Sequence, residues 1–214
     1  MLSLTLPQGK PLRVLCLGAH CDDIEIGCAG TLMTLQHRHP GTSFEWVVFT
    51  REEGRDRETR DAAERLLGAG GAQVEVLDLR MSYLPYEGAR VKDSFEAVKA
   101  RVQPDLIFTH RLEDRHQDHR AIAELTWNTW RNHLVFEYEI PKYEGDLGHP
   151  NLFVPLDAGV AERKVEVLMS AFPSQASRNW FRRDVFQAHM RMRGIECNAP
   201  SGCAEAFHAR KVTL

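Results

Sequence analysis

Short apolar segments alternate with longer amphipathic segments through this chain, and this alternation limits the fold more than any other feature of the sequence. Residues 13–19 form an apolar run that ends at small residues, as a strand buried on both faces does. Residues 24–38 then carry apolar side chains at helical spacing, and Pro40 and Gly41 end that pattern. The same reasoning predicts strands over residues 44–50, 74–79, 105–109, 134–140 and 152–156. It predicts further helices over residues 55–67, 93–102, 117–132, 158–171 and 178–193.

Strands that alternate with helices are typical of right-handed βαβ crossovers. They predict an α/β fold whose mostly parallel sheet is covered by helices on both faces. With 214 residues, 43% of them hydrophobic, and with neither an internal repeat nor a linker, the chain is expected to form a single domain over residues 1–214. In such a fold the catalytic loops gather at the carboxyl ends of the strands.

The charge balance and the cysteines indicate where the protein works and what it does not bind. There are 27 basic and 30 acidic residues, a net charge of -3, which disfavours nucleic acid and anionic membranes as partners. No apolar run is long enough to span a bilayer, and residues 1–11 lack the features of an export signal. The five cysteines contain no C-x-x-C pair, so we expect reduced thiols. A cytoplasmic protein is therefore expected, with its oligomeric state, a homo-oligomer included, left open.

Two polar clusters each follow a predicted buried strand. His20 and Asp23 in the first cluster are three residues apart, and so are His116 and His119 in the second. This spacing turns two side chains toward one point where the backbone is helical or turn-like. Imidazole nitrogen and carboxylate oxygen are usual zinc ligands, and catalytic zinc takes three protein ligands. His20, Asp23 and His119 therefore form a candidate zinc site.

Two further side chains of these clusters are candidates for catalysis. Asp22 is adjacent to a candidate ligand but points elsewhere in a tight turn, which makes it a candidate general base. His116 remains to polarise the substrate or to protonate a leaving group. Taken singly, each cluster could also be a solvated loop or a helix cap. Because both clusters directly follow buried strands, a functional site is the favoured interpretation.

These residues resemble the motifs of the LmbE/PIG-L family of zinc-dependent deacetylases, which remove acetyl groups from N-acetylglucosamine-containing substrates. Residues 19–23, Ala-His-Cys-Asp-Asp, are similar to the family's A-H-P-D-D motif, and residues 25–31 are similar to its E-x-G-x-G-G-T continuation. Residues 116–119, His-Gln-Asp-His, resemble its H-x-D-H motif. Residues 50–63 resemble a family loop and its R-x-x-E-x-x-x-A-A helix, and the resemblance extends over about residues 13–210.

The resemblance implies a Rossmann-like sandwich and a zinc-dependent N-deacetylase acting on a small amino-sugar substrate. It implies three metal ligands, namely His20, Asp23 and His119. Asp22 would be the general base, and His116 would stabilise the oxyanion or act as the acid, with Asp118 orienting His116. Arg55 best matches the family's arginine and is expected to contact the substrate; a helix cap or an ion pair with Glu52, Glu53 or Glu58 is the alternative.

Some features of the sequence leave alternatives open. Cys21 stands where the family usually has proline, and a thiol beside the metal could ligate or be oxidised. An amidase of a glucosamine conjugate with another acyl group would use the same metal chemistry. A nucleotide-binding α/β module without catalysis is an alternative of another class, although Gly18, Gly27 and Gly30 are too far apart for a phosphate-binding turn. A structural metal site is a third alternative, but it would leave Asp22 and His116 without a role.

Overall fold

A seven-stranded sheet with the strand order β3-β2-β1-β4-β5-β7-β6 forms the centre of the protein. The computed structural model describes residues 5–7 and 9–213. The strands are β1 (Arg13–Gly18), β2 (Ser43–Thr50), β3 (Ala72–Leu79), β4 (Leu106–His110), β5 (Leu134–Tyr138), β6 (Leu152–Pro155) and β7 (Ala204–His208). Neighbours from β3 through β5 pair in parallel, whereas β7 is antiparallel to both β5 and β6. The expected mostly parallel sheet is confirmed.

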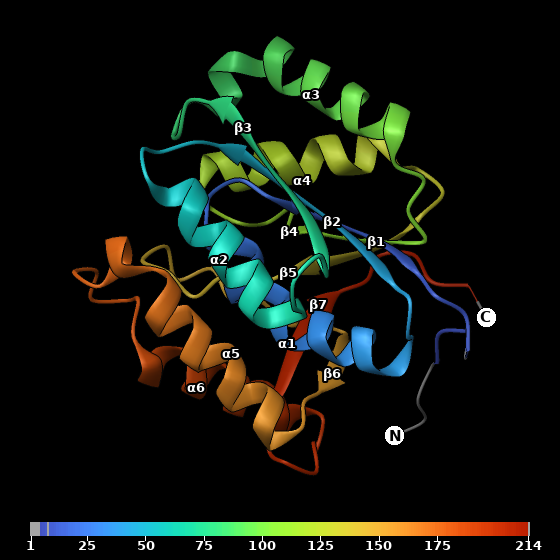
Figure 1. The fold of residues 1–214 in the computed structure, drawn as a ribbon, viewed down its shortest axis with the longest axis vertical. Helices are drawn as coiled ribbons and strands as arrows, with labels where there is room; N and C mark the ends of the chain where they lie inside the picture. Colours follow the sequence, from blue (N-terminus) through green and yellow to red (C-terminus); the bar gives the residue numbers. More distant parts are fainter. Residues whose placement is uncertain (1–4, 8, 214) are drawn as a thin grey trace.

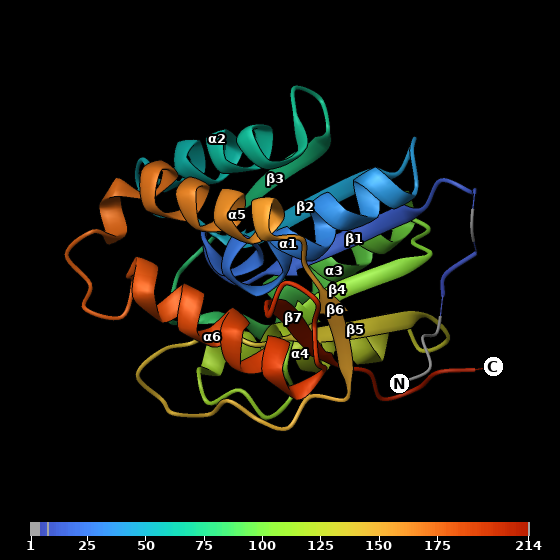
Figure 2. The same cartoon turned by 90° about the horizontal axis from the view of Figure 1, so that it is seen from below.

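Helices cover both faces of this sheet, as the sequence predicts. They are α1 (Asp23–Arg38), α2 (Arg55–Leu67), α3 (Gly88–Arg101), α4 (Gln117–Thr129), α5 (Ala158–Ala171) and α6 (Arg183–Glu196). Figure 1 shows α3 and α4 on one face and α1, α2 and α5 on the other, and the apolar core is divided into two clusters accordingly. Helices α2 and α5 lie side by side (Figure 2). In the part of the chain that the structure describes, no helix has both the length and the apolar character needed to cross a membrane.

The structure differs from the sequence prediction mainly in its last quarter. The sequence pattern does not predict β7, because the pairing that makes it a strand comes from β5 and β6, which lie far from it in sequence. Helix α6 begins at Arg183 rather than at residue 178, since a short 3₁₀ turn at Pro173–Gln175 and further turns precede it. Helix α3 begins at Gly88, earlier than residue 93, after a 3₁₀ turn at Leu84–Glu87.

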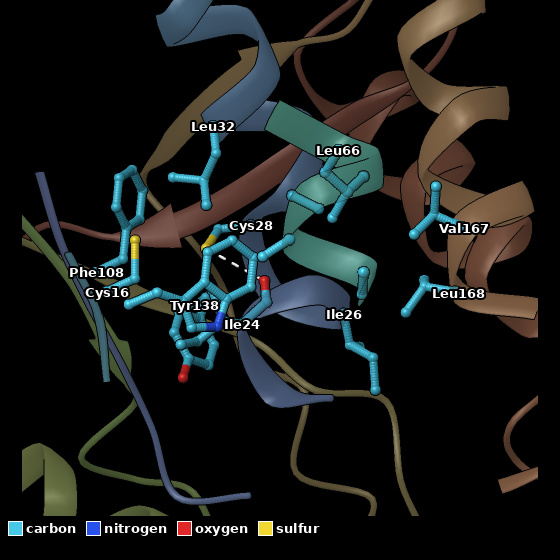
Figure 3. Close-up of a cluster of buried hydrophobic side chains, with 14 of the residues drawn as sticks. Cys16, Ile24, Ile26, Cys28, Leu32, Leu66, Phe108, Tyr138, Val167 and Leu168 are labelled. Atoms are coloured by element: carbon cyan, nitrogen blue, oxygen red, sulfur yellow. Dashed lines mark hydrogen bonds between the residues drawn. The ribbon is translucent and has the colours of Figure 1, made fainter. Parts of the chain in front are cut away.

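Helix α1 lies very close to the sheet, and this contact places its N-terminus. Cys28 of α1 belongs to the same buried cluster as Cys16, Phe108 and Tyr138 of the sheet (Figure 3). A Cβ atom at Gly27 would lie 2.4 Å from the ring of Tyr138, so only glycine permits the approach. The Tyr138 hydroxyl donates a hydrogen bond to the carbonyl of Leu17 at 2.7 Å, which joins this packing to the end of β1.

A buried ion pair joins α5, β7 and the middle of α1. Lys164 Nζ lies 2.6 Å from Oε1 of Glu205, and both side chains are 3% exposed. The same ammonium donates to the carbonyl of Ile26 at 2.6 Å. The Glu205 carboxylate accepts the backbone N–H groups of Gly30 at 2.9 Å and Thr31 at 2.6 Å. This pair therefore holds the helix that carries Asp23 in its place on the sheet.

Replacing Lys164 with methionine is expected to lower the free energy of unfolding by about 3–5 kcal/mol, because the Glu205 carboxylate stays buried without its cation. Urea denaturation followed by circular dichroism measures the change. Lys92→Met is the control, since Lys92 pairs with Glu96 on the surface and its loss should leave the midpoint unchanged. A loss below about 1 kcal/mol for Lys164→Met would show that the pair does not stabilise the fold.

Candidate metal centre

The two polar clusters lie together at the carboxyl ends of β1 and β4. These strands are neighbours in the sheet and pair in parallel. β1 ends at Gly18, and a turn over residues 19–22 leads into α1, whereas β4 ends at His110 and residues 111–116 lead into α4. The chain leaves β1 toward β2 on one side and returns to β4 on the other, which is the switch point where open α/β sheets bind ligands. The two clusters therefore meet where the sequence predicts.

The side chains of His20, Asp23 and His119 lie close together and are called the triangle below, although the two imidazoles approach different oxygens of Asp23. Nδ1 of His20 lies 3.1 Å from Nε2 of His119 and 3.4 Å from Oδ2 of Asp23. Nε2 of His119 lies 3.4 Å from Oδ1 of Asp23. All three residues are buried. The structure thus brings together the three residues that the sequence predicts as metal ligands.

The distances within the triangle fit a tetrahedrally coordinated cation. Zinc binds imidazole nitrogen and carboxylate oxygen at about 2.0–2.2 Å, so two ligand atoms at the corners of a tetrahedron are about 3.3–3.6 Å apart. The separations of 3.1–3.4 Å between His20, Asp23 and His119 are close to this range. Two imidazoles and one carboxylate are a usual zinc set, and three protein ligands leave a fourth position for water or substrate.

The charges around the triangle also favour a cation. Burial acts to lower the pKa of His20, but the carboxylates of Asp23 and Asp118 outweigh it and raise this pKa to about 10. Burial together with His110 lowers the pKa of His119 to about 3, so this imidazole is neutral and offers a lone pair. Burial acts to raise the pKa of Asp23, yet the facing imidazoles bring it well below its ordinary value. A proton on His20 thus balances the carboxylates around it, and a metal cation bound there would displace this proton.

Each histidine of the triangle has a carboxylate on its other nitrogen. Nε2 of His20 lies 3.2 Å from Oδ2 of Asp118, and Nδ1 of His119 lies 3.0 Å from Oδ2 of Asp114. Such carboxylates fix the tautomer of a ligating histidine and raise the basicity of the nitrogen that faces the metal. The sequence analysis places Asp118 on His116, whereas the structure places its carboxylate on His20. The reason is that α4 begins here, and its first turn directs the backbone N–H of Asp118, not the carboxylate, toward His116.

Asp22 lies beside the triangle without belonging to it. Its φ of 127° is rare for a residue with a side chain, and such strain is typical of turns that carry function. Oδ2 accepts a hydrogen bond from Nη2 of Arg55 at 2.9 Å, and among the described residues Oδ1 accepts none. Burial raises the pKa of Asp22 to about 7, with Arg55 acting against the rise. Asp22 is therefore a carboxylate that can exchange a proton near neutral pH.

Arg55 contacts groups in the protein that the sequence does not identify. It is buried, and its guanidinium donates to Asp22, to the carbonyl of Cys21 and to Glu52. Arg55 is the first residue of α2, and helical side chains lean toward the helix N-terminus, which brings the guanidinium to the turn after β1. Its two terminal nitrogens therefore hold Asp22 and the turn after β1, and the contact with a substrate stays a prediction.

His116 faces the triangle from the start of α4. Its ring centroid is 4.8 Å from that of His20 and 4.5 Å from that of His119. Nδ1 accepts the backbone N–H of Asp118 at 3.3 Å, so the neutral ring carries its proton on Nε2. Burial and the nearby His20 lower the pKa of His116, which favours this neutral form. His116 is therefore a hydrogen-bond donor beside the ligand atoms.

Sequence reasoning assigned no role to His110 and Asp114, which also contribute to the site. His110 Nε2 accepts the backbone N–H of Ala19 at 2.9 Å and lies 3.1 Å from Oδ2 of Asp23. Because the lone pair of this nitrogen accepts the Ala19 N–H, His110 holds the turn after β1 in place rather than ligating. Both residues belong to or follow the same buried strand that precedes His116, and this position is the signal that could have identified them.

Cys21 does not add a ligand to the site. In the described part of the chain, the sets of side chains that offer mutually close ligand atoms are His20, His116 and His119, and Asp23, His110 and His119. The three predicted ligands are divided between these two sets, which share His119, and Cys21 is in neither set. Burial raises the pKa of the Cys21 thiol to about 12, so it stays protonated. The departure from the family's proline therefore leaves the donor set unchanged.

The loop after β3 forms one border of the site. The carboxylate of Asp118 accepts the backbone N–H groups of Ser82 at 2.6 Å and Leu84 at 3.2 Å, so the residue that contacts His20 also fixes this loop. Two exposed aromatic side chains project from it, Tyr83 at 39% and Tyr86 at 77% exposure. Their rings meet edge to face with centroids 6.1 Å apart. The border thus carries an aromatic surface next to the metal centre.

Solved structures share this fold over nearly the whole chain. A conserved protein of Thermus thermophilus is 21% identical with a TM-score of 0.78, and the match covers 95% of this chain and 96% of that one. A 4-carboxy-2-hydroxymuconate hydratase of Pseudomonas putida is 18% identical with a TM-score of 0.75, covering 95% and 98%. The N,N'-diacetylchitobiose deacetylase of Pyrococcus horikoshii is 21% identical with a TM-score of 0.71, covering 92% and 83%.

These likenesses show the fold, and a fold that serves both a hydratase and a deacetylase does not decide the reaction. The family is decided by the sequence motifs on the fold. The model of the family described as PIG-L, GlcNAc-PI de-N-acetylase, matches residues 15–130, more than half of the chain and the part that contains all the predicted site residues. The chain belongs to the PIG-L family.

Proposed function

We propose that this protein is a zinc-dependent N-deacetylase that removes an acetyl group from an N-acetylated amino sugar or an N-acetylglucosamine conjugate. The observation that carries the proposal is the triangle of His20, Asp23 and His119, which lies beside a carboxylate and an imidazole that do not belong to it. Metal-assisted amide hydrolysis requires this combination of ligands, base and donor. Family membership supports the same class of reaction.

Bound zinc would lower the pKa of a water molecule and polarise the amide carbonyl. Side chains of the protein would accept and donate the protons. Asp22 would accept a proton from the attacking water at Oδ1, while Arg55 keeps the other carboxylate oxygen in place. Water adds its oxygen to the carbonyl carbon, the C–N bond breaks, and the proton from Asp22 goes to the departing amine nitrogen. Acetate and the free amino sugar leave.

His116 would act on the carbonyl oxygen. Its Nδ1 is occupied by the backbone N–H of Asp118, so Nε2–H is the donor that faces the site. A donor placed where negative charge develops stabilises the transition state, and removal of one such donor costs about 10²–10³ in kcat. Asp118 would orient His20 and hold the loop after β3, and Arg55 would hold the carboxylate of Asp22 in place.

The geometry of the site bears differently on the two alternative functions, a nucleotide-binding module and an amidase. A nucleotide-binding module would place phosphate at the N-terminus of α1, where the carboxyl groups of Asp22 and Asp23 disfavour a second anion. Gly27 and Gly30 lie inside α1 and pack against Tyr138 and Leu156. An amidase with another acyl group uses the same centre and is separated from a deacetylase only by its substrate.

Metal content and acetate release together test the proposal. Protein purified without chelator is analysed for metal, and acetate release is then measured from N-acetylglucosamine, diacetylchitobiose and N-acetylglucosamine conjugates, before and after chelation and zinc addition. One zinc per chain and zinc-dependent acetate release are expected. Bound metal with release of another acid would indicate the amidase, and a protein that binds no metal would contradict the proposal.

The aromatic surface on the loop after β3 is proposed to contact the substrate. Tyr86→Ala is expected to raise KM by about three- to tenfold at unchanged kcat, because ring stacking on a sugar face is lost in the ground state and the transition state alike. Steady-state kinetics on the best substrate of the panel measure this. Ile195→Ala is the control, since Ile195 is 75% exposed on α6 and away from this loop. An unchanged KM for Tyr86→Ala would place the substrate elsewhere.

The cysteines are consistent with the expected compartment. All five are free thiols in the structure. We therefore propose that the protein works in the cytoplasm, where thiols stay reduced.

A further inference from the structure

Lys142 lies in the loop between β5 and β6, over residues 139–151, and its side chain is only 8% exposed. Its Nζ atom donates to Oδ2 of Asp114 at 2.9 Å. It also donates to Oδ1 and Oδ2 of Asp146 at 2.8 and 2.7 Å. One buried ammonium thus joins two carboxylates, one beside the metal centre and one in the loop itself.

The Asp114 carboxylate connects this ammonium to a metal ligand. The oxygen that accepts from Lys142 is the same Oδ2 that lies 3.0 Å from Nδ1 of His119. Its other oxygen, Oδ1, accepts the backbone N–H of His116 at 2.8 Å. Lys142 is therefore one hydrogen bond away from the side chain that orients His119.

Asp146 connects the same ammonium to the loop. Its Oδ2 accepts the backbone N–H of Arg115 at 2.7 Å, and its carbonyl accepts from Nη1 of Arg111 at 2.6 Å. The side chains of Asp114 and Asp146 are only 3% and 6% exposed, so little solvent screens the two carboxylates from each other.

Without Lys142, two like charges would face each other in a nearly dry space. Asp114 and Asp146 each lie within 2.9 Å of Nζ, so their separation depends on the cation between them. Like charges at such short range repel strongly where water is excluded. Asp114 or the loop would have to move, and a shift of Asp114 would release the imidazole of His119 from its tautomer and orientation.

We propose that Lys142 is a positioning residue that holds the Asp114 carboxylate on His119 and thereby fastens the β5–β6 loop to the metal centre. The inference rests on the proposed metal site but not on the reaction assigned to it. Because coupling between sites is reciprocal, metal binding also orders the loop.

Metal affinity of the purified apoprotein, measured by competition with a chromophoric zinc chelator, tests this role without any substrate. Lys142→Met is expected to weaken zinc binding by about 10- to 100-fold, as losses of partners behind metal ligands do. Lys142→Arg keeps a cation between the carboxylates and should retain most of the affinity. Lys92→Met is the control, because Lys92 pairs with Glu96 on the surface of α3 and touches no part of the site, and its zinc affinity should stay within about threefold.

A double-mutant cycle shows whether Lys142 acts through Asp114. Asp114→Asn alone should weaken zinc binding by about 10- to 100-fold, and adding Lys142→Met should cause no further loss. Hydrogen exchange measures the second part of the proposal: zinc should slow exchange of the amides of residues 143–148 in the wild type but not in Lys142→Met. Circular dichroism verifies that each variant is folded, and Lys142→Arg and Asp114→Asn keep the test decisive if Lys142→Met does not fold.

Three results would overturn the proposal: zinc affinity of Lys142→Met within about threefold of the wild type, additive losses in the cycle, or equal loop exchange with and without zinc. A wild-type protein that binds no zinc would overturn the metal site and this inference together. Zinc binding without acetate release would contradict the proposed reaction alone, and the role of Lys142 would still be decided by affinity.

Discussion

Replacing Asp22 with asparagine is expected to lower kcat by about 10²–10⁴-fold while the bound metal stays stoichiometric. Asparagine has the size of aspartate, and its amide oxygen can still accept from Arg55, which lies 2.9 Å from Oδ2 in the wild type. The ligand triangle does not include Asp22, so metal content should not change. What is lost is the carboxylate that takes the proton from water. Metal analysis and steady-state acetate release on the same preparation measure both effects.

Asp61→Asn serves as the control for this substitution. Asp61 pairs with Arg65 on the surface of α2, and its side chain is 46% exposed. This variant should match the wild type in kcat, in metal content and in thermal midpoint. Asp22→Asn with kcat within about threefold of the wild type would remove Asp22 from the mechanism, and loss of metal from it would make Asp22 a ligand.

His119→Ala is expected to lose the metal itself. His119 is one of the three side chains of the triangle, 3.1 Å from His20 and 3.4 Å from Asp23, and two remaining ligands hold zinc far more weakly. Loss of a residue that only hydrogen-bonds to a metal ligand lowers metal affinity by about 10- to 100-fold. Loss of a ligand itself should therefore lower zinc affinity by at least about 100-fold. Zinc competition on folded protein measures the loss, and acetate release should fall in proportion to the bound metal.

His116→Ala is the matched comparison, because the two histidines are three residues apart and their ring centroids lie 4.5 Å from each other. This variant should keep stoichiometric zinc and lose about 10²–10³ in kcat, as expected for a lost transition-state donor. If His116→Ala lost the metal and His119→Ala kept it, the ligand assignment would be wrong. Circular dichroism on both variants separates metal loss from unfolding.

Much of the fold could be predicted from the sequence because the strands of the parallel part are continuous apolar runs. β1, β2 and β4 are buried along nearly their whole length, and the helices between them have a recognisable apolar face. β7 could not be predicted in this way. Its strand character depends on β5 and β6, and its Glu205 is buried only because Lys164, 41 residues away, is buried with it.

The candidate ligands could also be predicted, for a local reason. A spacing of three residues after a buried strand directs two side chains to one place, and the order of the parallel strands brings the two places together. Arg55 and Asp118 were identified as site residues but their contacts were not. The contact of Arg55 with Asp22 spans 33 residues and that of Asp118 with His20 spans 98, and no local pattern encodes such pairs.

The sequence by itself determined the α/β class, the candidate ligand residues and the two turns that carry them, because these depend on periodicity and spacing along the chain. The tertiary structure alone decided which carboxylate lies behind which histidine, that Arg55 supports Asp22, and that Lys142 links a distant loop to Asp114. Hydrogen bonds and buried ion pairs of this kind form between segments that only the packed sheet and helices bring within about 3 Å of each other.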